Sequence, residues 1–222
     1  MKPHRPLVAL DFDGTLVSCK EKQLYALDEA SKLHHVAYDA HDTFWDLKRN
    51  GSSTLKALTA TGMDAVQASK VAAAWIDIVE SEQASEHDRL LPDVADALRG
   101  LAASADLMLL SARRNAALLE RQLVSLDLLK FFPIWETVSP LGGVSNSKAQ
   151  RLVHHGACCY VGDTESDWSA SVAAALPFYL LSTGQRSNSF FETHFLDLEN
   201  APPVIYGNFQ HVADAIKHDI LS

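Results

Sequence analysis

The stretch Leu7-Val-Ala-Leu-Asp11-Phe-Asp13-Gly14-Thr15-Leu16 decides how the rest of the sequence is interpreted. Its first four residues are apolar, which predicts a strand buried on both faces, as in a parallel sheet. Asp11 and Asp13 follow at the carboxyl end of that strand, and Gly14 permits a sharp turn. Open α/β sheets bind ligands at this end. Because two neighbouring carboxylates repel each other unless a cation or a shared proton offsets their charge, the stretch predicts a site for a divalent cation and a phosphate.

The composition narrows the class of protein. The chain has 222 residues, 47% of them hydrophobic, and a formal net charge of −9. This length suits one domain, or one domain with an insertion. The acidic balance argues against sequence-independent binding to nucleic acid or to an anionic membrane, which needs clustered Lys and Arg. No apolar run approaches the ~18 residues of a membrane span.

Two further observations bear on location. The start, Met1-Lys-Pro-His-Arg-Pro6, leads directly into the first predicted strand and has no signal-peptide pattern. Three cysteines, Cys19, Cys158 and Cys159, form neither a disulfide framework nor a CxxC metal pattern. We therefore expect a reduced, cytoplasmic protein.

Residues 17–88 show helical periodicity and no convincing strand. The candidate helices are Gln23–Leu33, one or two helices within Thr43–Leu58 that break near Asn50-Gly51, and Met63 to about Ser85. This block predicts a helical insertion of roughly 70 residues, near the lower limit of domain size.

From about Leu91 the sequence alternates between strand and helix patterns, which indicates a βαβ array. The expected strands are Asp106–Ser111, Pro133–Val138, Ala157–Gly162, Pro177–Leu181 and an edge strand at Val204–Tyr206. The expected helices are Pro92–Ala103, Asn115–Leu129, Ser147 to His155, Ser166–Ala175, a short one through Phe190-Phe191, and Phe209 to Ile220. The fold class is therefore α/β, a parallel sheet with helices on both faces and an inserted helical block.

Three polar signals accompany Asp11 and Asp13. Ser111 ends the second strand, and Lys148 falls in the first turn of a helix, after Ser145-Asn-Ser147, where an N-cap is expected. Gly162-Asp163-Thr-Glu-Ser-Asp167 ends the fourth strand. In a parallel sheet these side chains meet at one edge.

These motifs, in this order, resemble the haloacid dehalogenase-like (HAD) superfamily of phosphatases. The matching residues are Asp11–Thr15, Ser111, Lys148 and Gly162–Asp167. The resemblance covers nearly the whole chain. It implies a Rossmann-like core of residues 1–16 and 89–222, and a helical cap of residues 17–88 similar to that of phosphoglycolate phosphatase and β-phosphoglucomutase.

The resemblance also implies roles. Asp11 is expected to be the nucleophile that forms an aspartyl-phosphate, and Asp13 the general acid and base. Mg²⁺ is expected at the Asp11 carboxylate, the Asp13 backbone carbonyl and Asp163, supported by Asp167. Lys148 is expected to neutralise charge on Asp11 and on the transferring group.

A phosphate-binding set follows from the same motifs. Ser111 is expected to donate to a phosphoryl oxygen, backbone amides near Phe12 and after Ser111 to do the same, and Thr15 to steady the loop. The full expected set is Phe12, Gly14, Thr15, Ser111, Ala112, Arg113 and Lys148. Two readings remain open for Arg113 and Arg114, a contact with substrate phosphate or an exposed salt bridge.

The sequence thus predicts a Mg²⁺-dependent phosphatase that acts on a small phosphorylated metabolite. Asp13, the second aspartate of the first motif, is absent from dehalogenases and favours phosphate chemistry. Two alternatives remain: a phosphomutase of the β-phosphoglucomutase type, and a non-catalytic binding module on the same fold. Within the cap, Lys48-Arg49-Asn50-Gly51-Ser52-Ser53 is the most polar candidate for substrate contact, or else a solvated loop.

Overall fold

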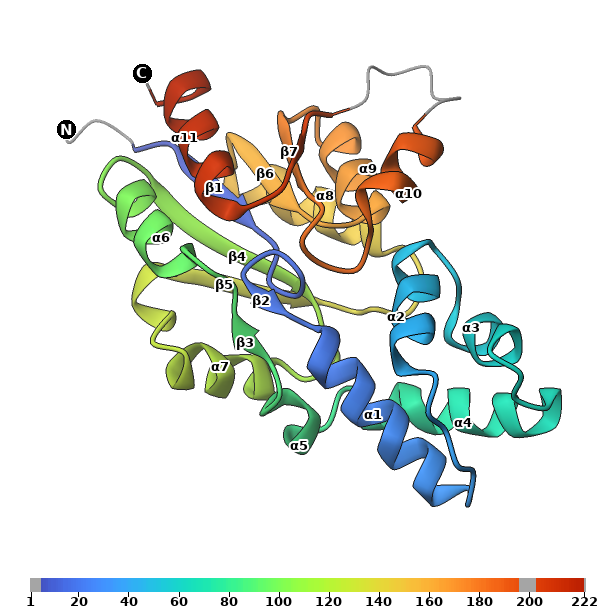
Figure 1. Cartoon of the computed structure of the whole chain (residues 1–222). Helices are drawn as coiled ribbons and strands as arrows, with labels where there is room; N and C mark the ends of the chain where they lie inside the picture. Colours follow the sequence, from blue (N-terminus) through green and yellow to red (C-terminus); the bar gives the residue numbers. More distant parts are fainter. Residues whose placement is uncertain (1–4, 196–202, 222) are drawn as a thin grey trace. The chain divides into compact units, whose positions relative to one another are not determined.

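The computed structural model describes residues 5–195 and 203–221, and its main feature is a six-stranded sheet in the order β5-β4-β1-β6-β7-β8 (Figure 1). Every neighbouring pair in this sheet is parallel. The strands are β1 Leu7–Leu10, β4 Asp106–Ala112, β5 Ile134–Val138, β6 Cys159–Gly162, β7 Phe178–Leu181 and β8 Ile205–Tyr206. The predicted α/β class is confirmed, with β8 at an edge as expected.

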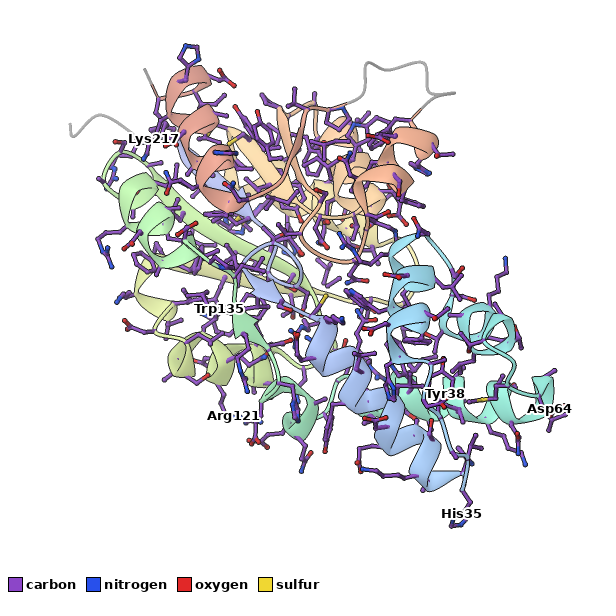
Figure 2. All side chains as sticks on the ribbon, in the orientation of Figure 1. His35, Tyr38, Asp64, Arg121, Trp135 and Lys217 are labelled. Atoms are coloured by element: carbon purple, nitrogen blue, oxygen red, sulfur yellow. The ribbon has the colours of Figure 1, made fainter. Side chains whose placement is uncertain are left out.

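Helices cover both faces of the sheet because its strands are apolar on both sides. Val8 and Leu10 of β1 belong to one buried cluster, and Leu7 and Ala9 to the other. The first cluster includes residues of α6 Val94–Ala102, α7 Ala116–Ser125 and α11 Phe209–Asp219. The second includes residues of α8 Val144–His155 and α9 Glu165–Ala173. Lys217 of α11 lies against α6, where a Cβ on Gly100 would stand 2.9 Å from its Nζ (Figure 2).

The helix that carries Lys148 begins earlier than predicted. α8 starts at Val144 with Gly143 as its N-cap, so that Lys148 is its fifth residue and lies beyond the first turn. Gly142 and Gly143 both have positive φ, of 70° and 65°. This pair of glycines makes the turn that the sequence analysis had placed at Ser145-Asn-Ser147. The expected contribution of the helix dipole at Lys148 is correspondingly weaker, because that effect fades after the first turn.

The chain divides into two compact units. The first comprises Met1–Ser18, Leu90–Gly184 and Asn200–Ser222, and the second Cys19–Arg89 and Gln185–Glu199. The prediction had placed residues 185–199 in the core rather than in the helical part. The boundaries 1–16, 17–88 and 89–222 of the two domains stay a prediction.

The second unit is helical and has a core of its own, which includes Leu27, Phe44, Leu58 and Val71. Its helices are α1 Lys20–Leu33, α2 His41–Arg49, α3 Thr54–Ala60, α4 Ala65–Ile78, α5 Glu82–Ser85 and α10 Asn188–His194. The single long helix expected from Met63 to Ser85 is divided into α4 and α5. Asp64 and Ser81 cap these two helices through their side chains (Asp64 is labelled in Figure 2).

A two-stranded sheet was not predicted. It consists of β2 Val17–Ser18 and β3 Arg89–Leu90. Strands of two residues are too short to show an alternating pattern. Beside them, the Leu91 N–H donates to the Leu16 carbonyl at 2.9 Å.

The segment that begins at Gln185, after β7, belongs to the helical unit and packs on the end of α2. The Ser187 N–H donates to the Arg49 carbonyl at 3.0 Å, and the Ser187 hydroxyl donates to Asn50 Oδ1 at 2.8 Å. Gly51 has a φ of 86°, and a Cβ there would lie 2.6 Å from the Phe190 ring. Glycine is therefore required at position 51 for this segment to lie against α2. Within the described residues, no helix is both long and apolar enough to cross a bilayer.

Candidate active site

A tight loop follows β1 and presents the first motif. The Asp11 N–H continues the sheet pairing by donating to the Val161 carbonyl at 2.9 Å, and the Gly14 N–H donates to the Val17 carbonyl at 2.8 Å. Gly14 has a φ of 80°, which a residue with a Cβ rarely adopts. Phe12 and Thr15, which belong to this loop, are fully buried. The turn thus fixes the direction of the carboxylates at positions 11 and 13.

Lys148 joins the first and fourth motifs. Its Nζ donates to Asp11 Oδ1 at 2.8 Å, to Asp167 Oδ1 at 2.6 Å and to the Tyr160 hydroxyl at 2.9 Å. The Tyr160 hydroxyl donates in turn to Asp167 Oδ1 at 2.8 Å. The Lys148 side chain is only 3% exposed, so these charge-assisted bonds act in a medium of low dielectric constant.

Both carboxylate oxygens of Asp167 accept hydrogen bonds. While its Oδ1 accepts from Lys148 and Tyr160, its Oδ2 accepts from the Thr164 hydroxyl at 2.6 Å and from the Thr164 N–H at 3.2 Å. The Thr164 hydroxyl also accepts from the Asp167 N–H, which completes a capping box at the start of α9. Asp167 therefore anchors Lys148 through a rigid helix terminus.

Burial and charge shift the titration of this cluster. Burial, with Asp167 nearby, raises the pKa of Asp11 to about 7. Burial alone would lower the pKa of Lys148, but Asp11 and Asp167 together raise it well above its usual value. Burial opposes ionisation of Asp167 too, yet the charge and hydrogen bond of Lys148 lower its pKa overall. We conclude that Lys148 is a fixed positive charge beside Asp11.

Asp163 completes an acidic group at the same edge of the sheet. Carboxylate oxygens of Asp11, Asp163 and Asp167 all lie within 4.8 Å of one another. A Cβ on Gly14 or Gly184 would stand 2.1 or 2.0 Å from Asp163 Oδ2, so both glycines are needed for the chain to pass so close to this carboxylate. Hard oxygen donors of this kind suit Mg²⁺, and a cation would oppose the burial that raises the pKa of Asp11. The donor set therefore fits a divalent metal ion.

Arg113 contacts Asp13, an arrangement that neither reading of the sequence anticipated. Its Nε and one terminal nitrogen, Nη2, bind the two carboxylate oxygens of Asp13, both at 2.6 Å. Its other terminal nitrogen, Nη1, donates to Gln122 Oε1 of α7 at 3.0 Å. The arginine is only 4% exposed, so it is not part of an exposed salt bridge.

Comparisons with known proteins bear on this geometry. A family model described as a haloacid dehalogenase-like hydrolase matches residues 6–175, well over half of the chain. The chain belongs to the haloacid dehalogenase-like hydrolases. A search of curated proteins found no significant match.

Solved structures of this HAD-like hydrolase's relatives share its fold. A haloacid dehalogenase-like family hydrolase from Streptococcus pneumoniae superposes with a TM-score of 0.73 at 18% identity, over 97% of this chain and 100% of that one. A predicted phosphoglycolate phosphatase from Haemophilus somnus gives 0.67 at 16%, over 97% and 99%. Mycobacterium tuberculosis protein tyrosine kinase A gives 0.70 at 18%, over 96% and 99%. At these identities the likeness concerns the fold alone.

The structure of this HAD-like hydrolase places each residue that the sequence analysis singled out. Asp11, Lys148, Asp163 and Asp167 lie together, whereas Asp13 is engaged by Arg113. Ser111 is buried near the end of β4, and the pairing of Leu10 with Leu109 puts it level with Phe12. Within the part of the chain that the structure describes, the hydroxyl of Thr15 has no hydrogen-bond partner. Ala112 is half-buried as the last residue of β4.

Three residues near the site were missed. Tyr160 lies on β6, and the sequence analysis gave it no role beyond its place in the expected strand Ala157–Gly162. Thr183 donates from its hydroxyl to the Gly14 carbonyl at 2.8 Å, and Gly184 follows it against Asp163. Thr183 and Gly184 follow β7 at the edge of the sheet where the other motifs also lie. That position in the sequence could have identified them as candidate site residues.

Proposed function

We propose that this chain is a phosphatase that hydrolyses a small phosphorylated metabolite, with Asp11 as the nucleophile. One observation carries the proposal: Lys148 Nζ binds Asp11 and Asp167 in a buried cluster, with Asp163 beside them. An arrangement that fixes one carboxylate against a permanent positive charge, at the ligand-binding edge of a parallel sheet, is suited to receive a phosphoryl group.

The residues divide the reaction into two steps. In the first, a carboxylate oxygen of Asp11 bonds to phosphorus, the phosphoester bond breaks, and Asp13 gives a proton to the leaving oxygen. In the second, Asp13 takes a proton from water as that water attacks the aspartyl-phosphate, which frees Asp11 and inorganic phosphate. Ser111 donates a hydrogen bond to a phosphoryl oxygen, and Lys148 stabilises the charge that develops.

A metal ion has a place in this proposal. The Asp11 and Asp163 carboxylates and the Asp13 backbone carbonyl would hold Mg²⁺. When bound, the ion would supply charge neutralisation between the carboxylates and the phosphate dianion. Asp167, whose two oxygens accept from Lys148, Tyr160 and Thr164, supports the site by fixing Lys148.

The structural relatives add support without deciding the activity. One of them is named a predicted phosphoglycolate phosphatase, but another, with a slightly higher TM-score and identity, is named a protein tyrosine kinase. The proposal therefore depends on the side chains of this chain.

The test is release of inorganic phosphate from a panel of sugar phosphates, phosphoglycolate and nucleotides. Asp11→Asn removes the nucleophile, so activity should fall at least a thousandfold, whereas Asp96→Asn, which alters an exposed carboxylate on α6, should leave it intact. Chelation by EDTA should stop turnover and Mg²⁺ should restore it. Turnover only with a sugar bisphosphate present would instead show a phosphomutase. If no substrate of the panel were hydrolysed or gave a hydroxylamine-sensitive phosphoenzyme, the chain would be a non-catalytic binding module.

A further inference from the structure

Cys158 and Cys159 are neighbours at the point where the loop after α8 becomes β6. The Cys158 N–H donates to the Leu7 carbonyl at 2.8 Å, and Cys159 is the first residue of β6, paired with Val8. Both carry free thiols, of which Cys159 is fully buried and Cys158 partly exposed. Since free cysteine behaves as a small hydrophobic residue, packing accounts for the buried thiol but not for the partly exposed one beside it.

A bend at Cys158 brings both cysteine side chains to one face of the sheet. Side chains of a regular strand alternate between its two faces. Cys159 and Val161 accordingly belong to the buried cluster on one face, and Tyr160 to the cluster on the other. The same alternation would place Cys158 with Tyr160, yet Cys158 packs against the cluster that contains Cys159. The two sulfur atoms are therefore neighbours, and a hydrogen bond joins their thiols.

This hydrogen bond makes the two cysteines unequal. It lowers the pKa of Cys158 to about 7, against the opposite effect of burial, and the backbone N–H groups of both residues add to the lowering. The same hydrogen bond, together with burial, raises the pKa of Cys159 well above its usual value. Because the thiolate is the nucleophilic form of cysteine, Cys158 is the reactive member of the pair, and Cys159 stays a thiol.

Cys19, the third cysteine, differs from this pair in its surroundings. It is 2% exposed, and its sulfur accepts a hydrogen bond from Gln23 Nε2 at 3.7 Å. A thiol buried so deeply is inert towards dissolved oxidants. Cys19 is therefore an internal reference for the reactivity of the other two.

We propose that Cys158 and Cys159 form an oxidation site that reacts with a hydroperoxide, closes a reversible disulfide between the two neighbours, and thereby slows turnover at the candidate active site. The effect on turnover rests on the proposed phosphatase function, whereas the oxidation itself does not. An accessible thiolate beside a thiol that can resolve its oxidised form is the arrangement of a redox-sensing site.

The oxidation has two steps. In the first, the Cys158 thiolate attacks one oxygen of the hydroperoxide, the O–O bond breaks, and the leaving alkoxide or hydroxide takes a proton from water. Cys158 is then a sulfenic acid. In the second, the Cys159 sulfur attacks the Cys158 sulfur, the S–O bond breaks, and the hydroxyl leaves as water with the proton that Cys159 held. The two thiols thus supply the two electrons that reduce the hydroperoxide to an alcohol or water.

Closing this ring strains the backbone between the two residues. Two Cα atoms joined by a trans peptide lie about 3.8 Å apart, closer than the ~4.4–6.8 Å that disulfides usually span. The peptide between Cys158 and Cys159 must therefore turn as the ring closes. A strained disulfide is also readily reduced by other thiols, which makes the modification reversible.

The turn of this peptide reaches the active site through Tyr160, the residue that follows Cys159. The Tyr160 hydroxyl contacts Lys148 Nζ at 2.9 Å and Asp167 Oδ1 at 2.8 Å. A displaced Tyr160 leaves two buried charged groups with one partner fewer, so Lys148 is held less firmly beside Asp11. We therefore expect oxidation of the cysteine pair to lower kcat.

The first experiment detects the disulfide without reference to activity. The reduced full-length protein is treated with one equivalent of hydrogen peroxide, and the remaining thiols are alkylated under denaturing conditions before mass analysis. Trypsin cuts after Arg151 and Arg186, which leaves Cys158 and Cys159 in one peptide and Cys19 in another. We expect the shared peptide to escape alkylation and lose about 2 Da, dithiothreitol to restore it, and Cys19 to stay fully alkylated.

Three results of this experiment would overturn the proposal. The first is a shared peptide that stays reduced at about tenfold excess of peroxide. The second is sulfinic acid on Cys158 without the disulfide, since Cys159 would then not reach the oxidised sulfur. The third is loss of the Cys19 thiol at the same rate as the Cys158 thiol, which would show oxidation without selectivity.

Variants assign the two roles. Cys159→Ser should stop at the sulfenic acid, which dimedone traps on Cys158, whereas Cys158→Ser should leave Cys159 reduced. Cys19→Ser is the matched control and should form the disulfide as the parent chain does. Dimedone on Cys159 in Cys158→Ser would contradict the assignment. The measurement on the parent chain needs no variant, so it decides the proposal even where a substitution prevents folding.

The second experiment measures kcat before oxidation, after it, and after reduction. We expect kcat to fall about fivefold with the disulfide in place and to recover with dithiothreitol. Cys158→Ser, which cannot close the ring, should keep its kcat through the same treatment. Full activity with the disulfide formed would overturn the link to Tyr160. A disulfide in a chain without phosphatase activity would uphold the oxidation site and defeat both the proposed function and the effect on turnover.

Discussion

Arg113 and Asp13 form a bidentate ion pair, with two N···O distances of 2.6 Å. The pair joins the loop after β1 to the end of β4, and Gln122 holds the far side of the guanidinium. An Arg–carboxylate pair of this geometry stabilises the ionised carboxylate and fixes its orientation. Such an Asp13 is prepared to accept a proton from water, whereas its role as an acid requires the pair to loosen.

Replacing Arg113 should therefore change catalysis more than substrate binding. We expect Arg113→Lys, which keeps the charge but loses the bidentate contact, to lower kcat by about ten- to a hundredfold with KM within about twofold. Steady-state kinetics with the best substrate of the panel measures this, with Arg114→Lys, at the exposed neighbouring position, as the control. A large rise in KM at unchanged kcat would instead support the direct phosphate contact that the sequence suggested.

Tyr160 offers a second test because its hydroxyl serves Lys148 and Asp167 at once. In Tyr160→Phe both charged groups lose a buried partner, so we expect a loss of stability of about 1–3 kcal/mol and a fall in kcat of roughly tenfold. Denaturant unfolding and phosphate release measure the two effects. Tyr179→Phe, which removes a hydroxyl that donates to Asp219, is the matched control and should lower stability without a comparable effect on kcat. Full activity in Tyr160→Phe would show that Asp11 and Asp167 position Lys148 unaided.

A substitution at Gly184 tests whether the close approach of the chain to Asp163 is needed for metal binding. An added Cβ would lie 2.0 Å from Asp163 Oδ2 and 2.4 Å from the Cα of Gly14, and the second of these atoms belongs to a tightly bonded loop. Gly184→Ala should therefore displace the Asp163 carboxylate, and we expect the Mg²⁺ concentration needed for half-maximal activity to rise at least tenfold. Gly207→Ala, where an added Cβ meets nothing within 4 Å, should behave as the parent chain. Identical Mg²⁺ dependence in both variants would remove Asp163 from the proposed metal site.

The sequence predicted the sheet because its strands are short apolar runs, and the site because Asp11 and Asp163 directly follow two of them, with Asp167 four residues beyond Asp163. Those signals are local. The roles of Arg113 and Tyr160 depend on which side chains the packing brings together: Arg113 reaches Asp13 across 100 positions of sequence. The start of α8 was misplaced because serines and glycines compete as helix-entry signals, and the positive φ of Gly143 decided it.

The helical unit shows even more clearly that sequence patterns do not predict contacts between residues far apart in the chain. Periodicity identified its helices, but not that Gln185 and Arg186 group with them after an interval of some hundred residues. That association puts a second cation beside Lys48, and no spacing in the sequence indicates it. Sequence patterns locate elements, whereas the electrostatic environment of a side chain depends on contacts distant in the chain.

The lowered pKa of Lys48 makes the stability of the helical unit depend on pH. In the folded chain this pKa is about 8, against an ordinary value of 10.5, so between these two pH values the unfolded chain binds more protons at this position. The free energy of unfolding must therefore rise with pH across that window, and the penalty is fully present below pH 8.

The dependence is isolated by comparing the parent chain with Lys48→Met, because other groups titrate equally in both. Urea unfolding at a series of pH values should show that the parent gains on the order of 3 kcal/mol relative to the variant as pH rises through the window. Lys56→Met, at an exposed position, should give a difference that does not vary with pH. A parent-minus-variant difference that stays constant with pH would mean that Lys48 titrates normally and carries no desolvation penalty.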